Sequence, residues 1–593
     1  MKKLNQVFDT EYETEVQDIK TNTKELNKGD LFFCIKGFNV DRHDYVNEAL
    51  EKGASALVVD HKVNSSLPQI VVDNTNEALS DMAFKFYDYP SKKMTMIGVT
   101  GTDGKTSTST ILYELLNQVS KCGYIGTNGV CCETYTDKSN NTTPTPEHLH
   151  RFLNNFYLND CKYVCMEAAS EALAQGRCKN IEFDYTIFTN LTHEHLNFHK
   201  SMENYMNAKC ILFEQTKKDG YSFLNIDDKY SEEIFKKCNG KVIYYGSNKK
   251  ADVRFSDVVI YHDYTLFTIT YKDKTYKINS PLLGMFNVYN LTAALSVLLI
   301  MGVDIDKLDY KKLYVDGRMT NIDLGQDFKV IVDYAHTPNG YLNLFLLTKT
   351  LEANKTIIVA GSAGERDKTK RPIMGKILVD NADYVIFTYE DPRSEDPIDI
   401  INDLTSEVMD KKDKFEVVVD RGEAIKRAID MAEKDNMILI LGKGNETYEA
   451  LKDGKIYFND IEEAKKCIKE RKKLEVWKIL LFYGQSLLPQ IVFFNILKWG
   501  DNMDTSYIIG MLSIVVTFIC GIIAKRVPWF NNNLIPLQNL LIGLLAALIH
   551  YLITKDFSLA LTLSGITAGG TYDILHNMSK IDWDKLLDLI KFN

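Results

Sequence analysis

The sequence has few of the features that mark disulfide-rich proteins, secreted proteins or nucleic-acid-binding proteins. Eleven cysteines are scattered over 593 residues without a C-x-x-C pair, and Cys131 and Cys132 are adjacent, so local zinc or redox motifs are not expected. A formal net charge of −10 argues against nucleic acid as a partner, because neutralising phosphates requires a dense basic surface. The acidic N-terminus lacks a long apolar core, so no signal peptide is expected. These absences indicate a reduced, cytoplasmic setting.

Upstream of residue 465, the chain has the pattern of a multidomain α/β protein. Its length corresponds to about three or four domains of ordinary size. Short β-branched runs alternate with helical stretches, which predicts parallel sheets with helices on both faces. Strands are expected at 56–60, 96–100, 185–191, 329–335, 356–361, 384–388 and 437–444. Ligands of such sheets bind at the carboxyl ends of the strands.

A glycine-containing loop, "GVTGTDGKTS" at 98–107, follows one of these strands and precedes a helical stretch. Its backbone N–H groups and the helix N-terminus are suited to cradle phosphate oxygens. Lys105 would neutralise the β- and γ-phosphates, and Thr106 would hold Mg²⁺. Asp103 adds a negative charge within the loop, and the motif is one residue shorter than the general phosphate-binding pattern. A plain strand-to-helix turn is the alternative.

A second cluster of polar residues extends from Glu167 through His193, His195 and His199 to Lys209. The His-x-His-x₃-His spacing offers three imidazoles, which is typical of a zinc site. An oxygen-rich Mg²⁺ site would instead use Glu167 and one histidine, with ATP phosphates completing the coordination. Three histidines on a solvated loop are the alternative without a metal.

The last hundred residues are much more apolar than the rest. Four runs approach the length of roughly 20 residues that crosses a bilayer, at 476–497, 507–524, 534–553 and 557–572. Buried core helices are the alternative, although almost no polar face separates the runs. The basic residues before the first run and after the second place the N-terminal part and the C-terminus in the cytoplasm if there are four spans.

The motifs upstream of residue 465 resemble, in order, those of the Mur ligase family, and among them the MurE type. The resemblance covers roughly residues 15–465. It rests on T-G-T-x-G-K-T in the loop, E-x-x-S-x-A-L-x-Q-x-R from Glu167, F-T-N-L-x-x-x-H-L-x-x-H-x-x-M-E-x-Y-x-x-A-K from Phe188, "GMFNVYN" (284–290), "DGRM" (316–319), "VDYAHTP" (332–338), "GSAGERDKTKRPIMG" (361–375), "EDPRSEDP" (390–397), "DRGEAI" (420–425) and "LGKGNE" (441–446).

This resemblance implies an α/β protein with three ligase domains, to which the hydropathy pattern adds an all-α transmembrane domain. The expected order is a UDP-sugar domain (1–90), a central ATP-binding domain (91–316), a Rossmann-like amino-acid domain (317–465), a basic linker (466–475), a four-span transmembrane domain (476–575) and a cytoplasmic tail (576–593). The expected location is therefore the cytoplasmic membrane, with the ligase domains in the cytoplasm.

The reaction implied by the resemblance is ATP-dependent amide formation in peptidoglycan precursor synthesis. ATP phosphorylates the D-Glu carboxylate of UDP-MurNAc-L-Ala-D-Glu, and the amine of a diamino acid attacks the acyl phosphate. The expected cofactors are ATP and Mg²⁺. The catalytic residues would be Lys105, Glu167, His195 and Lys209, the last as a carbamate. The Mg²⁺ ligands would be Thr106, Glu167, His195 and carbamylated Lys209. ATP would contact Gly101, Thr102, Asp103, Gly104, Lys105, Thr106, Ser107, Asn287, Arg318 and Asp333.

The same resemblance assigns the two remaining substrates. The UDP-sugar would contact Thr23, Lys24, Asn141, Thr142, Thr143, Ala169, Gln175 and Arg177. The diamino acid would contact Arg366, Glu390, Asp391, Pro392, Arg393, Gly442 and Glu446. Arg393 favours meso-diaminopimelate, since a guanidinium grips a carboxylate that lysine lacks. "EDPR" replaces the family's D-N-P-R, however, and its extra negative charge keeps L-lysine as the alternative.

Other departures from the family pattern affect substrate contacts more than catalytic groups. Asn22-Thr23-Lys24 stands in place of D-S-R, which loses the bidentate fork of Arg. Ala169 replaces a serine, Asn197 replaces an aspartate, and Asp103 replaces the usual asparagine of the loop. Activity is therefore expected, with altered substrate affinity.

The apolar tail resembles a small phage holin. Its small residues, among them Gly565, Gly569 and Gly570, would form a close-packed face for self-association in the membrane. A passive tether is the first alternative. A membrane-permeabilising protein with an auxiliary ligase domain is the second, and a fusion of two neighbouring genes is the third.

Overall fold

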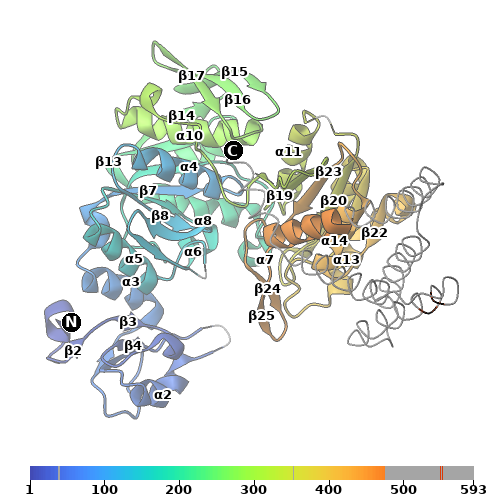
Figure 1. Ribbon diagram of the computed structural model, residues 1–593. Helices are drawn as coiled ribbons and strands as arrows, with labels where there is room; N and C mark the ends of the chain where they lie inside the picture. The colour runs from blue at the N-terminus through green and yellow to red at the C-terminus, as the bar shows by residue number, and fades with distance from the viewer. Residues whose placement is uncertain (38–39, 140, 352, 475–547, 549–550, 552–593) are drawn as a thin grey trace, which may run out of the picture. The chain divides into compact units, whose positions relative to one another are not determined.

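The computed structural model describes residues 1–37, 40–139, 141–351, 353–474, 548 and 551. The chain divides into two units, Met1–Lys472 and Lys473–Asn593. Three main sheets follow one another along the first unit (Figure 1). All seven strands expected from the β-branched runs are present, and each has parallel neighbours. The predicted three-domain α/β fold is confirmed, whereas the exact domain boundaries stay predictions.

The first sheet is small and wholly parallel, with strand order β3-β4-β5-β6. Its strands are β3 (Ile19–Lys20), β4 (Leu31–Phe33), β5 (Ala56–Val59) and β6 (Gln69–Val71), preceded by a pairing of β1 (Lys2–Lys3) with β2 (Glu15–Val16). Its helices are α1 (Leu4–Val7), α2 (Val46–Glu51) and α3 (Thr75–Phe86). α3 packs against α5 of the next domain, which anchors this sheet to the central one.

The central sheet has eleven strands in the order β10-β9-β8-β11-β7-β12-β13-β14-β15-β16-β17. Its parallel strands are β7 (Thr95–Thr100), β8 (Cys122–Gly126), β11 (Tyr163–Glu167), β12 (Phe183–Phe188), β13 (Thr216–Asn225), β14 (Lys241–Gly246) and β15 (Val253–Ile260). The antiparallel edges are β9 (Gly129–Cys132), β10 (Tyr135–Asp137), β16 (Thr265–Tyr271) and β17 (Lys274–Ser280). The seven helices are α4 (Lys105–Asn117), α5 (Pro146–Leu158), α6 (Ser170–Ala174), α7 (Leu196–His199), α8 (Met202–Glu214), α9 (Ser231–Phe235) and α10 (Met285–Ile300).

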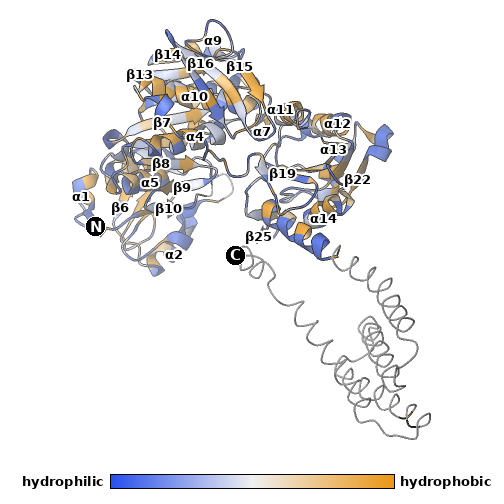
Figure 2. Cartoon of the chain, turned by 45° about the horizontal axis from the view of Figure 1, so that its top comes forward, coloured by the Kyte–Doolittle hydropathy of each residue, from blue (hydrophilic) through white to orange (hydrophobic). Residues whose placement is uncertain are grey.

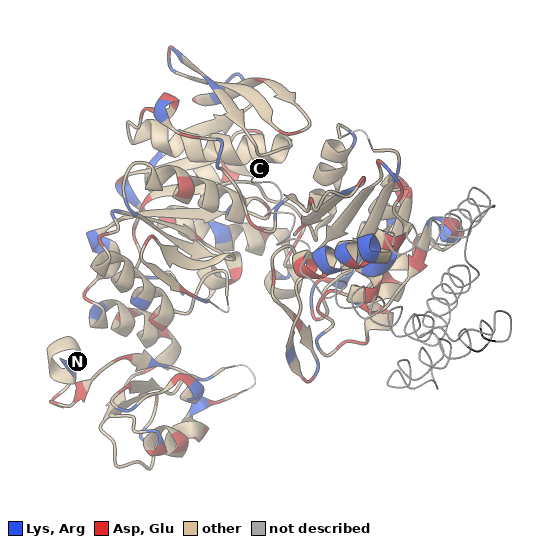
Figure 3. Ribbon diagram, in the orientation of Figure 1, with Lys and Arg blue, Asp and Glu red and all other residues tan. Residues whose placement is uncertain are grey.

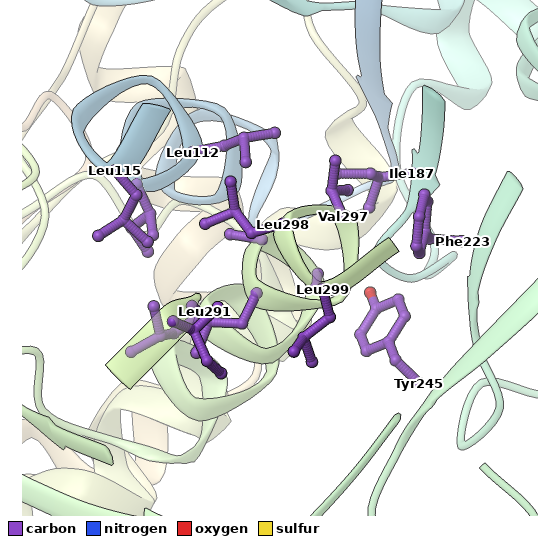
Figure 4. Close-up of a cluster of buried hydrophobic side chains, with 14 of the residues drawn as sticks. Leu112, Leu115, Ile187, Phe223, Tyr245, Leu291, Val297, Leu298 and Leu299 are labelled. Atoms are coloured by element: carbon purple, nitrogen blue, oxygen red, sulfur yellow. The ribbon is translucent and has the colours of Figure 1, made fainter. Parts of the chain in front are cut away.

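Apolar clusters on both faces hold the central sheet and its helices together. On one face α4 and α10 pack on each other and on the sheet, and Figure 4 shows Leu298 between them and Leu299 toward Tyr245. α10 is the most apolar of these helices and is coloured largely hydrophobic in Figure 2. The opposite face packs on α5 and α8. These helices fix the strand ends that carry the expected site.

The third sheet has the order β18-β19-β23-β20-β21-β22, parallel except for β18. Its strands are β18 (Thr320–Asn321), β19 (Lys329–Asp333), β20 (Thr356–Ala360), β21 (Tyr384–Phe387), β22 (Phe415–Val417) and β23 (Met437–Leu441), followed by the hairpin β24 (Tyr448–Leu451) and β25 (Gly454–Tyr457). Its helices are α11 (Pro338–Thr348), α12 (Arg371–Asn381), α13 (Pro397–Thr405) and α14 (Arg421–Met431). Apolar clusters again cover both faces.

A further helix, over 460–474, ends the continuous described part of the chain. Figure 3 shows Lys and Arg gathered along it. Its apolar side, with Ala464, Cys467 and Ile468, packs into a core of the third sheet. Most of the predicted basic linker, 466–475, is therefore the end of a packed helix.

The expected transmembrane domain requires a correction. No helix in the part of the chain that the structure describes is long and apolar enough to cross a membrane. The four expected spans lie outside the described residues, apart from Leu548 and Tyr551. Their prediction rests on the hydropathy and the length of the runs. The fold class that is supported is the three-domain α/β fold, without the all-α transmembrane domain. The predicted multi-pass location in the cytoplasmic membrane depended on the four spans and is withdrawn with them.

Candidate functional site

The phosphate loop connects β7 to α4, which begins at Lys105. Two glycines permit its shape, because Gly101 and Gly104 have φ values of 154° and 83°. A Cβ on Gly101 would lie 1.8 Å from Thr189 Oγ1, and one on Gly104 would lie 2.4 Å from Asn290 Oδ1. A larger residue at either position would therefore displace the loop.

Lys105 reaches back over this loop. Its Nζ donates to the carbonyl oxygens of Gly101, at 3.0 Å, and Thr102, at 2.8 Å. Burial lowers its pKa, while the charges of Glu167 and Asp103 act in the opposite direction. The ammonium thus lies directly beside the loop backbone, where it can neutralise phosphate.

A pair of oxygen donors lies at the start of α4 and the end of β11. Thr106 Oγ1 donates to Glu167 Oε2 at 2.9 Å. The other carboxylate oxygen of Glu167 accepts from Tyr124 OH at 2.9 Å and from the backbone N–H of Thr127 at 2.8 Å. Glu167 is fully buried. A hydroxyl and a carboxylate so close together fit the ligand preference of Mg²⁺.

Lys209, on α8, is buried beside the same loop. Its Nζ donates to Gly101 O at 2.7 Å and lies 4.3 Å from the centre of the Tyr205 ring. Burial, followed by the charge of Lys105, holds the pKa of Lys209 well below its usual range. A lowered pKa leaves more of the amine neutral, which is the form that reacts with electrophiles.

The three histidines of the loop face three different partners. His193 Nε2 lies 3.2 Å from Asp367 Oδ2, and His195 Nδ1 lies 3.2 Å from Glu171 Oε1. His199 Nε2 lies 2.9 Å from Ser170 Oγ, and burial lowers its pKa to about 4.

This arrangement does not support a three-histidine zinc site. Across the described residues, the group of His, Cys and carboxylate side chains in ligand geometry is a different one, His43, Asp60 and His61 in the N-terminal domain. Its members already pair with one another, and Asp41 holds the remaining nitrogen of His43 at 2.6 Å.

Thr143 connects some of the residues expected to contact the sugar nucleotide. Thr143 Oγ1 donates to Glu167 O at 2.8 Å and accepts from Ala169 N at 2.9 Å. Arg177 donates to Thr143 O at 2.8 Å and to Gln175 Oε1 at 2.7 Å. These contacts place the region after β11 next to the Thr106–Glu167 pair.

The third sheet contributes an ionic cluster at the carboxyl ends of its strands. Lys443, almost fully buried, donates to Asp391 at 2.8 Å and to Glu446 at 3.1 Å. Burial raises the pKa of Glu390 to about 7, and its Oε1 has no hydrogen-bond partner in the described residues. Arg393 has a positive φ of 54° and donates to Gly364 O at 3.1 Å.

Arg318 and Asp333 lie where the central and third sheets approach each other. Arg318 stacks on the Tyr334 ring at 4.1 Å and donates to Thr106 Oγ1 at 3.3 Å. Asp333 accepts from the backbone N–H groups of Met319 and Ala335, both at 2.8 Å, and burial raises its pKa. Arg318 therefore contacts the oxygen pair directly.

A single cavity of about 1050 Å³ connects the phosphate loop, the Thr106–Glu167 pair and the ionic cluster of the third sheet. Most of the residues predicted from the sequence line it. The exceptions are Thr23, Lys24, Gly101, Gln175, Asn287 and Pro392. Asn287 is nonetheless close by, since it accepts from Asn290, which in turn accepts from Thr108 of α4.

Several cavity residues were not predicted. Lys370 and Glu194 form a buried ion pair at 2.9 Å that joins the third sheet to the central one. Lys443, also not predicted, does not line the cavity but pairs with Asp391, which does. It stands within the quoted "LGKGNE" stretch, so a lysine between two glycines was the available signal. Glu194 and Lys370 are 176 residues apart, and nothing in their local sequence pairs them.

Comparison with known proteins agrees with this architecture. Three family models match: "Mur ligase family, catalytic domain" over 15–87, "Mur ligase middle domain" over 99–298, and "Mur ligase, glutamate ligase domain" over 317–444. Two relatives are named UDP-N-acetylmuramoyl-L-alanyl-D-glutamate–2,6-diaminopimelate ligase. The Bacillus licheniformis protein is 37% identical over 469 residues, and the Clostridioides difficile protein is 38% identical over 471; each alignment covers 77% of this chain and 96% of the relative.

Solved structures show the same fold. A diaminopimelate ligase of the same name aligns with a TM-score of 0.54 at 26% identity, over 78% of this chain and 97% of that one. The MurF ligase of Thermotoga maritima in complex with ADP aligns with a TM-score of 0.57 at 20% identity, over 78% and 99% of the two chains. The three family models together cover most of the residues that line the cavity. The chain therefore belongs to the Mur ligase family.

Proposed function

We propose that the chain is an ATP-dependent ligase that joins meso-diaminopimelate to the D-Glu carboxylate of UDP-MurNAc-L-Ala-D-Glu in peptidoglycan precursor synthesis. The observation that carries this proposal is the shared cavity. It opens on a phosphate loop, an oxygen pair and the ionic cluster of the third sheet, so that two different sheets supply its groups. The relatives named as diaminopimelate ligases support the choice of substrates.

The chemistry requires a carboxylate to become an electrophile. Transfer of the γ-phosphoryl group to the D-Glu carboxylate makes an acyl phosphate, and attack by the amine releases phosphate. The protein contributes positioning and charge neutralisation, as in phosphoryl transfer generally. Lys105 and the loop N–H groups bind the phosphates, and Arg318, close to Thr106, adds a second positive charge. Mg²⁺ supplies further neutralisation when bound, and Thr106 and Glu167 are the residues that fit it.

Lys209 is proposed to act as a carbamate. An unmodified ammonium in this buried position would add a positive charge beside Lys105, which is unfavourable. The lowered pKa of Lys209 favours the neutral amine. Its nitrogen adds to the carbon of CO₂ and releases one proton to solvent, which leaves an anionic carbamate. The carbamate would then supply an oxygen ligand and a counter-charge for Lys105.

The structure of the ionic cluster favours diaminopimelate over lysine. The sequence departure "EDPR" suggested extra negative charge, but Asp391 is paired with Lys443, and burial raises the pKa of Glu390 to about 7. The cluster therefore offers less free negative charge to a lone ammonium than its composition implies. Arg393 remains to bind the distal carboxylate of diaminopimelate.

The experiment is turnover of the full-length chain with UDP-MurNAc-L-Ala-D-Glu and ATP. ADP release and the mass of the nucleotide product are followed with meso-diaminopimelate or L-lysine as the acceptor. We expect the diaminopimelate adduct to predominate. A predominant lysine adduct would overturn the choice of amino acid. If neither acceptor supports ADP release, the proposed function is wrong.

A further inference from the structure

Asp103 is rigidly held by the carboxyl end of β12. Its backbone N–H donates to Asn190 Oδ1 at 2.9 Å. Its carbonyl oxygen accepts from Thr189 Oγ1 at 2.6 Å and from Asn190 Nδ2 at 3.1 Å. With both backbone groups occupied, the direction of its side chain is set by the central domain.

The carboxylate of Asp103 reaches the third sheet's domain. Oδ2 accepts from Asn339 Nδ2 at 3.1 Å, and Oδ1 lies 3.4 Å from Thr337 Oγ1. Both partners belong to the start of α11, where Thr337 is the N-cap and accepts from Gly340 N at 3.0 Å. A negative charge at the N-terminal end of a helix is also favoured by the helix dipole.

We propose that Asp103 is a positioning residue that docks the amino-acid domain onto the phosphate loop through Asn339. The inference rests on the proposed function and deepens it. Asp103, one of the two residues between the loop glycines, would link the position of the ATP phosphates to that of the incoming amine. Asp103 then has a role other than direct contact with ATP.

A second contact across the same boundary supports this docking. Lys370 donates to both oxygens of Glu194, at 2.9 and 3.1 Å, and to His336 O at 2.9 Å. His336 immediately precedes Thr337, so the start of α11 is held from two sides. The buried ion pair brings the domains together, and the Asp103 contact sets the phosphate loop against α11.

The polarity of the contact allows a sharp test. Asp103 accepts and Asn339 donates, so Asn339→Asp would place two carboxylates face to face. In the double variant Asp103→Asn/Asn339→Asp, the new amide at position 103 can donate to the new carboxylate at position 339, so the hydrogen bond is restored in the reverse direction. The new carboxylate would occupy the first turn of α11, where it is favoured. A role in docking therefore predicts rescue of Asn339→Asp by a second substitution inside the phosphate loop.

Steady-state kinetics of the full-length chain gives the first readout. We expect Asn339→Asp to lower kcat by about tenfold or more, because like charges in contact are strongly unfavourable. KM for ATP should change by less than about threefold, since Asn339 does not hold phosphate. Asp103→Asn/Asn339→Asp should recover most of the lost kcat. The control, Asn402→Asp at an exposed position of α13 in the same domain, makes the same chemical change without facing Asp103.

Amide hydrogen exchange gives a readout that is independent of turnover. Asn339→Asp should speed exchange in both 101–107 and 339–345, and the double variant should restore the wild-type rates. The proposal is overturned if Asn339→Asp behaves like Asn402→Asp, or if the double variant exchanges and turns over no better than Asn339→Asp. A wild-type chain without ligase activity would refute the proposed function, while the exchange rates would still decide the docking contact.

Discussion

At the scale of single residues, the lysines and arginines of the cavity determine the charge that the proposed substrates meet. Lys209 shows this most directly, because burial and the neighbouring charge of Lys105 lower its pKa, which favours the neutral amine that the proposed carbamate role requires. The family resemblance supplied this role from the sequence. The physical reason for it is visible only in the structure, since burial and the neighbouring charge are not properties of a local motif.

Lys209→Ala is expected to lower kcat by roughly 100-fold or more, as for loss of a group that stabilises developing charge. Short carboxylic acids should restore part of the activity, because they can occupy the space of the carbamate. Lys209→Arg is the matched control, since it keeps the positive charge but cannot form a carbamate. Steady-state ADP release measures all three chains, and full activity in either variant would exclude the carbamate role.

Arg393→Ala should raise KM for meso-diaminopimelate by roughly 10- to 100-fold, which is the range for losing hydrogen bonds to a charged group. KM for ATP should stay close to its original value. Arg393→Lys should restore little, because an ammonium lacks the bidentate fork. Equal KM values for diaminopimelate in the wild type and Arg393→Ala would show that another residue binds the distal carboxylate.

At the scale of elements, the cavity depends on ties between strand ends. Arg421, at the start of α14, forms a fully buried pair with Asp460, with contacts of 2.8 and 2.6 Å. The same guanidinium donates to Leu441 O, at the end of β23, at 2.9 Å, and to Tyr389 O at 3.3 Å. Leu441 is followed by Gly442, and Tyr389, two residues beyond the end of β21, is followed by Glu390. Arg421 thus positions part of the amino-acid site without touching the substrate.

Asp460→Ala should lower the free energy of unfolding by about 3–5 kcal/mol, because it leaves a buried guanidinium without its counter-charge. Urea titration followed by circular dichroism measures the change. Asp430→Ala, which removes a carboxylate from an exposed pair with Lys426, is the control and should cost less than about 1 kcal/mol. Similar losses in the two variants would contradict the special place of the Arg421–Asp460 pair.

The contact between α3 and α5 predicts a specific response to acid. His150, on α5, is buried against Phe84 of α3, and burial lowers its pKa to about 3. Between about pH 6.5 and pH 3, this imidazole is protonated in the unfolded chain but neutral in the folded chain. Its contribution to the free energy of unfolding therefore falls as pH decreases, by up to about 1.4 kcal/mol per pH unit. His150→Leu should flatten this part of the curve of urea midpoint against pH. An unchanged slope would show that His150 does not titrate on unfolding.

At the scale of the whole molecule, the sequence predicted the strands and a set of residues that mostly share one cavity, but it did not predict the long-range contacts between them. The parallel strands followed from β-branched runs, and most motif residues line one cavity. The Asp103–Asn339 contact joins residues 236 positions apart, and the antiparallel edges of the central sheet carry no comparable motif. The apolar C-terminal runs were predicted to cross a membrane from their hydropathy, but no helix in the described residues is long and apolar enough to do so. The runs lie outside those residues except at Leu548 and Tyr551.

The central claim is that this cavity activates a carboxylate as an acyl phosphate before an amine attacks it. The most direct measurement follows a heavy oxygen isotope placed in the D-Glu carboxylate of UDP-MurNAc-L-Ala-D-Glu, during turnover of the full-length chain with ATP and meso-diaminopimelate. The account predicts that one labelled oxygen appears in the inorganic phosphate for each amide formed. Amide formation with all released phosphate unlabelled would contradict it.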